Sequence, residues 1–174
     1  MTNTIYSDSD YENVKKQRKH YKIFIYVSLG IYLAISIVTL LYYMSLPYQS
    51  PKISNAKLIQ FLVTGIYIIV LYLFLNLKYR RVNCYYKILG YINTGIIESN
   101  YGEFVCFEDT VEVKEGVDFK LMKMSEWSHK KSEFFERKVL IDREKDFPDI
   151  KKGQKIKYLT QGNILIEYKI AEGE

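Results

Sequence analysis

The stretch Ile23–Leu46, IFIYVSLGIYLAISIVTLLYYMSL, decides the fold class, because it contains 24 residues and no charged side chain. As an α-helix it extends ~36 Å, at about 1.5 Å per residue, which exceeds the ~30 Å hydrocarbon core of a bilayer. A second uncharged stretch of 20 residues, Leu58–Leu77, reads LIQFLVTGIYIIVLYLFLNL and is also long enough to cross. We therefore expect two membrane-spanning helices.

The first stretch differs from a secretory signal peptide. The apolar core of a signal peptide has about 7 to 15 residues and ends at a small-residue cleavage site. The apolar run here is longer, and Met44–Pro47 offers no such site. We expect this segment to remain in the mature protein.

The two stretches are joined by residues 47–57, in which Pro47 and Pro51 disfavour a continuous helix. The helices should therefore form an antiparallel hairpin. Five basic residues precede the first stretch and four follow the second within ten residues, against two in the link. This asymmetry predicts a multi-pass protein of the cell membrane with both termini in the cytoplasm. The predicted membrane-flanking basic residues are Lys15, Lys16, Arg18, Lys19, Lys22, Lys78, Arg80 and Arg81.

The charge distribution limits the possible functions. All 20 acidic residues lie outside Ile23–Leu77, and neither predicted span contains an ionisable Asp, Glu, Lys, Arg or His. The spans therefore lack the usual marks of an ion path or proton relay. The chain from Ile88 onward contains 14 basic and 17 acidic residues, so the net charge of +5 comes from the membrane flanks. Nucleic acid is not expected as a partner.

One small-residue motif lies inside the first span. Gly30 and Ala34 have the small-xxx-small spacing that allows two helices to approach closely. The pair predicts either packing against the second span of the same chain, which we favour, or contact with a second copy or another protein.

The chain after Lys78 changes character. Residues 78–87 can continue the second helix into the interface, and from Ile88 short alternating segments predict β-strands. These segments suggest a small antiparallel barrel or sandwich. The expected organisation is a basic tail (1–22), a span (23–46), an external loop (47–57), a span (58–77) and a β-rich cytoplasmic domain (78–174). The fold class is thus a membrane α-helical hairpin plus a small all-β domain.

The expected strands lie at residues 91–98, 104–108 with 110–113, 119–124, 135–142, 155–159 and 164–170. Lys114–Val117 supplies one turn, and Thr160–Asn163 reads as a four-residue hairpin loop. Ser125–Glu133 is compatible with one helical turn or with an exposed loop.

The end of the chain carries a resemblance. The stretch from Val139 to Tyr158 places a Lys-Gly turn before the alternating segment KIKY, and the strand Gly162–Tyr168 follows. This pattern resembles the close of small OB- or SH3-like barrels. Two spans followed by such a barrel are similar in layout to uncharacterised two-span membrane proteins of low-GC Gram-positive bacteria, and more loosely to NfeD-type membrane proteins. The resemblance implies a fold and brings no catalytic residues.

Motifs for enzymatic chemistry are absent from the sequence. It contains no Walker A, GxGxxG, HExxH, CxxC or GxSxG motif, and its two cysteines, Cys84 and Cys106, lack the spacing of a zinc site. His129 lies beside Trp127 without a nucleophile placed by motif. We expect no catalytic residue, no metal and no cofactor.

One cluster outside the spans combines aromatic and basic residues. Its members are Trp127, Lys130, Lys131, Phe134, Phe135, Arg137 and Lys138. Such a cluster can form a surface for a protein partner or for lipid headgroups. Alternatively, and in our reading more ordinarily, its aromatic rings close the barrel core while its lysines are solvated.

Three functions are compatible with this sequence. We favour a non-enzymatic, membrane-anchored interaction module, for example a subunit of a membrane assembly. The alternatives are a domain that senses lipids or small ligands at the membrane surface, and an immunity protein against a membrane-active toxin. The expected partners are membrane lipids, a protein and, through Gly30 and Ala34, a second copy of the chain.

Overall fold

The computed structural model describes residues 2–128 and 132–171. The chain divides into two compact units. One unit is Lys15–Asn83. The other combines the N-terminal residues up to Val14 with the chain from Cys84 onward. Lys130 and Lys131 of the aromatic and basic cluster, and His129, lie outside the described residues.

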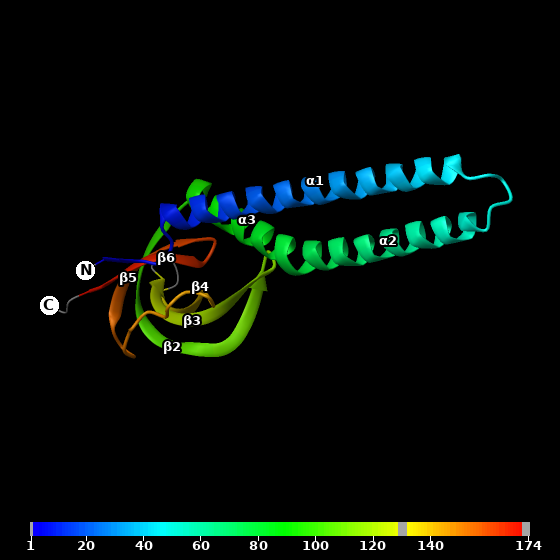
Figure 1. Cartoon of the computed structure of the whole chain (residues 1–174). Helices are drawn as coiled ribbons and strands as arrows, with labels where there is room; N and C mark the ends of the chain where they lie inside the picture. Colours follow the sequence, from blue (N-terminus) through cyan, green and yellow to red (C-terminus); the bar gives the residue numbers. More distant parts are fainter. Residues whose placement is uncertain (1, 129–131, 172–174) are drawn as a thin grey trace. The chain divides into compact units, whose positions relative to one another are not determined.

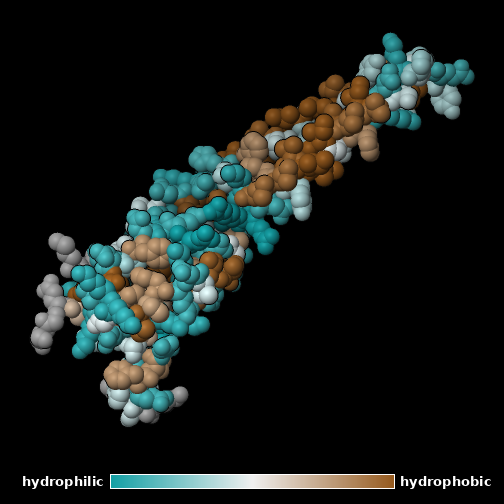
Figure 2. Space-filling model, turned by 90° about the horizontal axis from the view of Figure 1, so that it is seen from below, coloured by the Kyte–Doolittle hydropathy of each residue, from teal (hydrophilic) through white to brown (hydrophobic). Residues whose placement is uncertain are grey.

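The unit Lys15–Asn83 is an antiparallel helical hairpin (Figure 1). Helix α1 spans Asp8–Ser45 and helix α2 spans Lys52–Phe74. A π-helical turn, η1 (Leu75–Tyr79), leads into α3 (Arg80–Thr94). The two helical runs, Asp8–Ser45 and Lys52–Thr94, are long and apolar enough to cross a membrane. Figure 2 shows their apolar side chains as a brown band along the hairpin.

The link between the helices is shorter than the sequence suggests. Pro47 lies in the gap after α1, and Pro51 is the N-cap of α2 with φ of −63°. A proline fixes φ in the helical range and its missing N–H costs nothing at a helix start. The prolines therefore end one helix and begin the next, as expected.

Polar side chains connect the two long helices at mid-length. The amide Nε2 of Gln60 donates to Ser36 Oγ at 3.0 Å and to Thr64 Oγ1 at 3.3 Å. The hydroxyl of Tyr32 bonds to Thr64 Oγ1 at 3.1 Å. The ring of Tyr32 also stacks on Tyr67, with centroids 4.4 Å apart. Inter-helix hydrogen bonds of this kind help to hold helices together where water is excluded.

Gly30 and Ala34 lie on another face of α1. Both are exposed, and a Cβ added at Gly30 would meet no atom within 4 Å. The favoured prediction that this pair packs against the chain's own second helix is therefore wrong. The reason is helical geometry: Tyr32, two positions from either residue, faces α2, and a helix rotates about 100° per residue. Contact with another chain stays a prediction.

The second unit contains a closed five-stranded β-barrel with an added edge strand (Figure 1). The barrel strands are β2 (Glu98–Lys114), β3 (Val117–Ser128), β4 (Glu133–Asp142), β5 (Lys155–Gln161) and β6 (Ile164–Ile170). They pair in the order β2-β3-β4-β6-β5, and β5 pairs back onto β2. All pairings are antiparallel except β4–β6.

This order is a Greek key, because β5 returns after a long connection to lie beside β2. A five-stranded Greek-key barrel is also the architecture of OB folds. The predicted combination of a helical hairpin and a small all-β domain is confirmed, and the all-β domain is a barrel. The parallel β4–β6 pairing is the one departure from an antiparallel barrel.

Two turns of the barrel have the backbone that short hairpins require. Gly162 and Asn163 connect β5 to β6 with φ of 54° and 67°, and Glu115 and Gly116 connect β2 to β3 with φ of 51° and 78°. Two consecutive positive φ values define the type I′ turn, whose twist suits antiparallel strands. The predicted turn at Lys114–Val117 is confirmed. The loop predicted at Thr160–Asn163 is instead a two-residue turn.

Some sequence-based boundaries are wrong. The strand predicted from Tyr91 is the last turn of α3, which runs to Thr94 and buries Ile88, Leu89 and Ile92. The two segments predicted at 104–113 form one strand, β2, whose pairing shifts register between Glu108 and Val111. Of Ser125–Glu133, residues 125–128 belong to β3 and Glu133 to β4, while Ser132 lies in an exposed turn between the two strands.

The barrel unit has two apolar cores. One fills the barrel and contains Phe104, Met122, Met124, Val139, Ile141, Ile150, Ile156, Tyr158, Leu165 and Tyr168. The other gathers residues of α3 and Tyr6 against barrel strands and contains Tyr6, Ile88, Leu89, Ile92, Phe119, Leu121, Leu140, Ile164 and Ile166. The N-terminal strand β1 (Thr2–Thr4) pairs with β6, so the N-terminal residues are part of this folded unit.

Candidate functional site

The end of the β3–β4 hairpin carries exposed aromatic residues. Trp127 is 45% exposed, Phe134 69% and Phe135 40%. Trp127 and Phe134 lie opposite each other in the strand register, and their rings meet edge to face with centroids 4.9 Å apart. We call these three residues the aromatic end. The alternative that they close the barrel core is wrong, since the core is filled by other residues.

Strand geometry explains why the aromatic end stays uncovered. Strand β2 pairs with β3 only from Glu103, opposite Ser125, onward. Beyond Ser125 the β3–β4 ladder continues to Ser128, opposite Glu133, with no β2 partner. Side chains alternate between faces along a strand. Phe134 and Phe135 therefore lie on opposite faces of this two-stranded end, so the apolar surface is not confined to one side.

Gly102 allows β2 to pass close to the base of the aromatic end. A Cβ at this position would come within 2.9 Å of the Ser125 carbonyl oxygen and 3.1 Å of Glu126 Cγ. Real Cβ atoms avoid such contacts, so the crossing requires glycine. The close approach fixes β3 where it leaves the barrel.

A polar network lies beneath the aromatic end. The Tyr158 hydroxyl donates to Glu126 Oε1, and both residues are buried. Arg137 Nη2 lies 2.6 Å from Glu98 Oε2 and donates to Asn163 Oδ1 at 3.0 Å. Arg137 Nη1 lies 3.7 Å from Glu126 Oε2. Burial raises the pKa of Glu126, and the Arg137 charge partly opposes that shift.

The predicted basic members do not join the aromatic end as a group. The Arg137 side chain is only 18% exposed and is engaged in the network just described, so its role in a contact surface stays a prediction. Lys138 is exposed and lies opposite Lys123, four residues along β4 from Phe134. Lys123 in turn contacts Glu108 Oε1 at 2.6 Å and Glu136 Oε2 at 3.6 Å. The described part of the surface is therefore aromatic rather than basic.

The predicted membrane-flanking basic residues all lie in the unit Lys15–Asn83. Tyr21 and Phe24 of α1 contact Phe74 of α2, with ring centroids 5.3 and 4.8 Å apart. Residues before Tyr21 and after Phe74 therefore lie at the same end of the hairpin. Arg18 is half-buried, and the other seven residues of the set are exposed: Lys15, Lys16, Lys19, Lys22, Lys78, Arg80 and Arg81.

A second polar cluster secures the N-terminal segment to the barrel. Asp142, at the end of β4, is fully buried, and its Oδ1 accepts the Glu144 N–H at 2.9 Å. Within the described residues, Asp142 Oδ2 and the Tyr6 hydroxyl have no hydrogen-bond partner within 3.5 Å. Burial raises the pKa of Asp142, and it raises the pKa of Tyr6 and Tyr85, to which the Asp142 charge adds.

An ion pair lies beside this cluster. Lys145 Nζ contacts Asp10 Oδ2 at 2.8 Å and joins the first turn of α1 to the connection after β4. The cluster thus links the N-terminal segment to the end of β4. Among the described residues, no group of three or more His, Cys, Asp or Glu side chains is placed to hold a metal ion.

Comparison with known proteins returns no relative. No family model matches the chain, and no match is found among curated proteins or solved structures.

Proposed function

We propose that this protein is a membrane-anchored, non-enzymatic interaction module whose barrel docks a protein partner through the aromatic end. The observation that carries the proposal is the exposed, edge-to-face pair Trp127 and Phe134, with Phe135 on the other face of the hairpin. Trp is enriched among residues that dominate binding energy, and such anchors act from exposed positions in the free protein. Soluble surfaces rarely gather large apolar side chains without a binding role.

The aromatic end is held in place before any partner arrives. Edge-to-face pairing contributes about 0.5–1.5 kcal/mol beyond area burial. The Glu126, Tyr158 and Arg137 network connects the hairpin base to β5 and, through Glu98, to β2. A rigid anchor loses little conformational entropy on binding, so its affinity suffers less.

The helical hairpin supplies the membrane anchor in this proposal. Both basic flanks lie at one end of the hairpin. By the positive-inside rule, this supports a cytoplasmic location for the termini and the barrel. Confinement to a membrane raises the effective concentration of the module near a partner in the same membrane.

The proposed orientation in the membrane can be tested by labelling the native thiols. Cys106 is exposed. In a Cys84→Ser background, an impermeant maleimide should label Cys106 only after cells are permeabilised. A Ser50→Cys variant that lacks both native thiols should be labelled in intact cells. Labelling of Cys106 in intact cells would contradict the proposed orientation.

The docking proposal is tested by co-purification at native expression level from gently solubilised membranes. Trp127→Ala/Phe134→Ala should lose a partner that the wild-type protein retains in stoichiometric amount. The matched control is Val113→Ala, which removes an apolar side chain that is also exposed, on β2. Equal recovery with all three proteins, or recovery of the bait alone from wild type, would overturn the proposal.

A further inference from the structure

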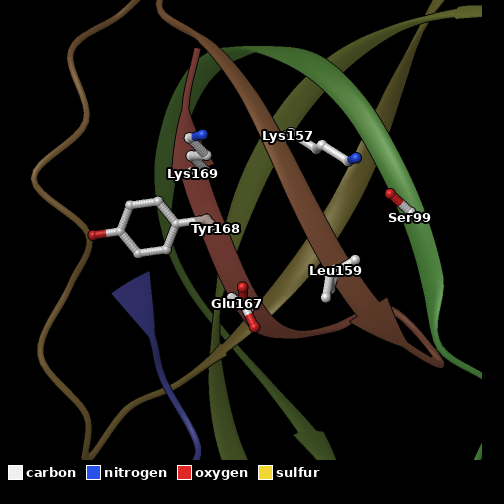
Figure 3. A pocket seen from close by; sticks show the side chains of 6 residues that line it. All are labelled: Ser99, Lys157, Leu159, Glu167, Tyr168 and Lys169. Carbon is white, nitrogen blue, oxygen red and sulfur yellow. The ribbon is translucent and has the colours of Figure 1, made fainter. Parts of the chain in front are cut away.

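A groove of about 270 Å³ opens on the outer wall of the barrel, where β2, β5 and β6 run side by side (Figure 3). It is lined by Ser99, Lys157, Leu159, Glu167, Tyr168 and Lys169. The Tyr168 ring points away from the other five side chains and belongs to the barrel core. Five side chains therefore determine what the groove can hold.

The groove carries two positive charges, from Lys157 and Lys169, and one negative charge, from Glu167. Lys157 and Lys169 are exposed and lie directly opposite each other on β5 and β6. Like charges in this position destabilise a sheet. Among the residues that the structure describes, neither ammonium takes part in an ion pair. By contrast, Lys155 on the same strand lies opposite Glu103.

The other side chains add a donor, an acceptor and an apolar patch. Ser99 of β2 lies opposite Leu159, and Lys157 extends toward it from β5. Glu167 lies opposite Leu159 on the other side, in β6. A ligand that satisfies all of these groups carries an anion for the two lysines and Ser99. It also carries a hydroxyl or amino hydrogen for Glu167.

We propose that this groove binds a small phosphate ester that carries a hydroxyl or amino group. A phosphate has a charge of about −1.5 to −2 and three acceptor oxygens, so it matches two ammonium groups and one hydroxyl better than a carboxylate does. Its charge-assisted bonds also relieve the repulsion between Lys157 and Lys169. The volume lies just below the ~300 Å³ at which pockets begin to hold drug-sized ligands, which fits a small ester.

This chemistry has two sources, a free ester and a phospholipid headgroup. The proposal is independent of the aromatic end, since no residue is shared. The test uses the full chain in nanodiscs of phosphatidylcholine, whose headgroup has no hydroxyl or amino hydrogen. Glycerol 3-phosphate and inorganic phosphate are titrated calorimetrically. Wild type should bind glycerol 3-phosphate saturably, and Lys157→Gln/Lys169→Gln should weaken binding at least tenfold.

Two controls separate this site from general charge effects. Lys151→Gln/Lys152→Gln removes the same charge from an exposed connection and should change the affinity less than twofold. Glu167→Gln should lower the affinity for glycerol 3-phosphate relative to the affinity for inorganic phosphate, because only the ester offers a hydroxyl to the carboxylate. The groove variant should unfold at the same temperature as wild type or higher, because it removes a repulsion.

A repeat in phosphatidylglycerol nanodiscs assigns the source. If the apparent affinity for the free ester is lower there, the lipid headgroup competes for the groove and is its ligand. If the affinity is unchanged, the free ester is the ligand. Absence of saturable binding by wild type in phosphatidylcholine, or equal binding by the groove and control variants, would overturn the proposal.

Discussion

Trp127 on β3 and Phe134 on β4 face each other across the hairpin, edge to face, and both remain exposed. A two-stranded ribbon is at best marginally stable in water unless something adds to its backbone hydrogen bonds. The ring contact supplies part of that stabilisation at the point where β2 no longer pairs with β3. The same contact keeps a large apolar surface open to solvent.

Trp127 is the single tryptophan of the chain, so its fluorescence reports on the aromatic end alone. In the purified full-length protein we expect emission typical of an exposed indole and efficient quenching by acrylamide. Added vesicles of zwitterionic or anionic lipid should leave the quenching constant unchanged, because the surface is proposed to bind protein. A blue shift and protection that depend on anionic lipid would instead favour a lipid-binding surface.

Removal of the aromatic end should cost the barrel little stability. Trp127→Ala/Phe134→Ala removes exposed rings and their contact, for which we expect a loss of at most about 1.5 kcal/mol. Phe119→Ala, at a fully buried position, should cost about 3–5 kcal/mol. The free energy of opening is measured for both variants by hydrogen exchange of the Val139–Ile141 amides. Equal losses in the two proteins would show that the aromatic end is part of the core.

Asp142 should make stability depend on pH. Its pKa in the folded state is raised above the ordinary value of 3.8, so the folded state holds the proton more tightly than the unfolded state. Its contribution is complete below pH ~3.8 and is lost as pH rises through the folded-state pKa. Asp142→Asn should therefore stabilise the barrel at neutral pH by about 1–3 kcal/mol, since a neutral side chain is buried instead of a charge.

Asp10 gives stability the opposite pH dependence. The effect of Asp142 is therefore measured as the difference in free energy of opening between Asp142→Asn and wild type. Burial acts to raise the pKa of Asp10, but its contacts with Lys145 and Ser7 lower it overall. Its contribution is present at neutral pH and is lost as pH falls. Hydrogen exchange from pH 4 to 8 should show the gap between Asp142→Asn and wild type widening with pH. A constant gap would contradict a buried, titrating Asp142.

The hairpin should depend on Gln60 and not on Gly30. Gln60→Leu removes the hydrogen bond to Ser36 of α1, together with a bond to Thr64 within α2. Hydrogen bonds between membrane helices contribute about 0.6 kcal/mol, up to 1.7. Gly30→Leu adds a side chain where the structure has open space. Steric trapping in bicelles should therefore show weaker helix association for the Gln60 variant alone. Weaker association after Gly30→Leu would mean that α1 turns a different face to α2.

The hairpin and much of the barrel follow from local patterns in the sequence. Uncharged stretches fix the long helices, and alternation in Lys155–Tyr158 places Ile156 and Tyr158 inside. The sequence also carries a pattern that identifies the facing sides of the two long helices. Polar residues recur every three or four positions at Ser28, Tyr32 and Ser36 and at Gln60, Thr64 and Tyr67. That spacing marks the two facing stripes better than Gly30 and Ala34 do.

Other features depend on contacts between distant parts of the chain. Tyr91–Thr94 has strand-forming side chains but completes α3, because Ile88, Leu89 and Ile92 pack against barrel strands. Trp127 and Phe134 look like core residues by composition. They are exposed because β2 does not pair with β3 beyond Ser125. The pairing of Glu126 with Tyr158 joins residues 32 positions apart. No local pattern specifies such contacts.

The most direct test of the central claim is photocrosslinking in intact membranes with benzoylphenylalanine in place of Phe134. The matched control carries the probe in place of Val113, which is also exposed on β2. We expect one discrete protein adduct at position 134, identifiable by mass spectrometry, and none at position 113. Adducts with lipid alone at position 134, or the same adducts at both positions, would contradict a protein-docking role for the aromatic end.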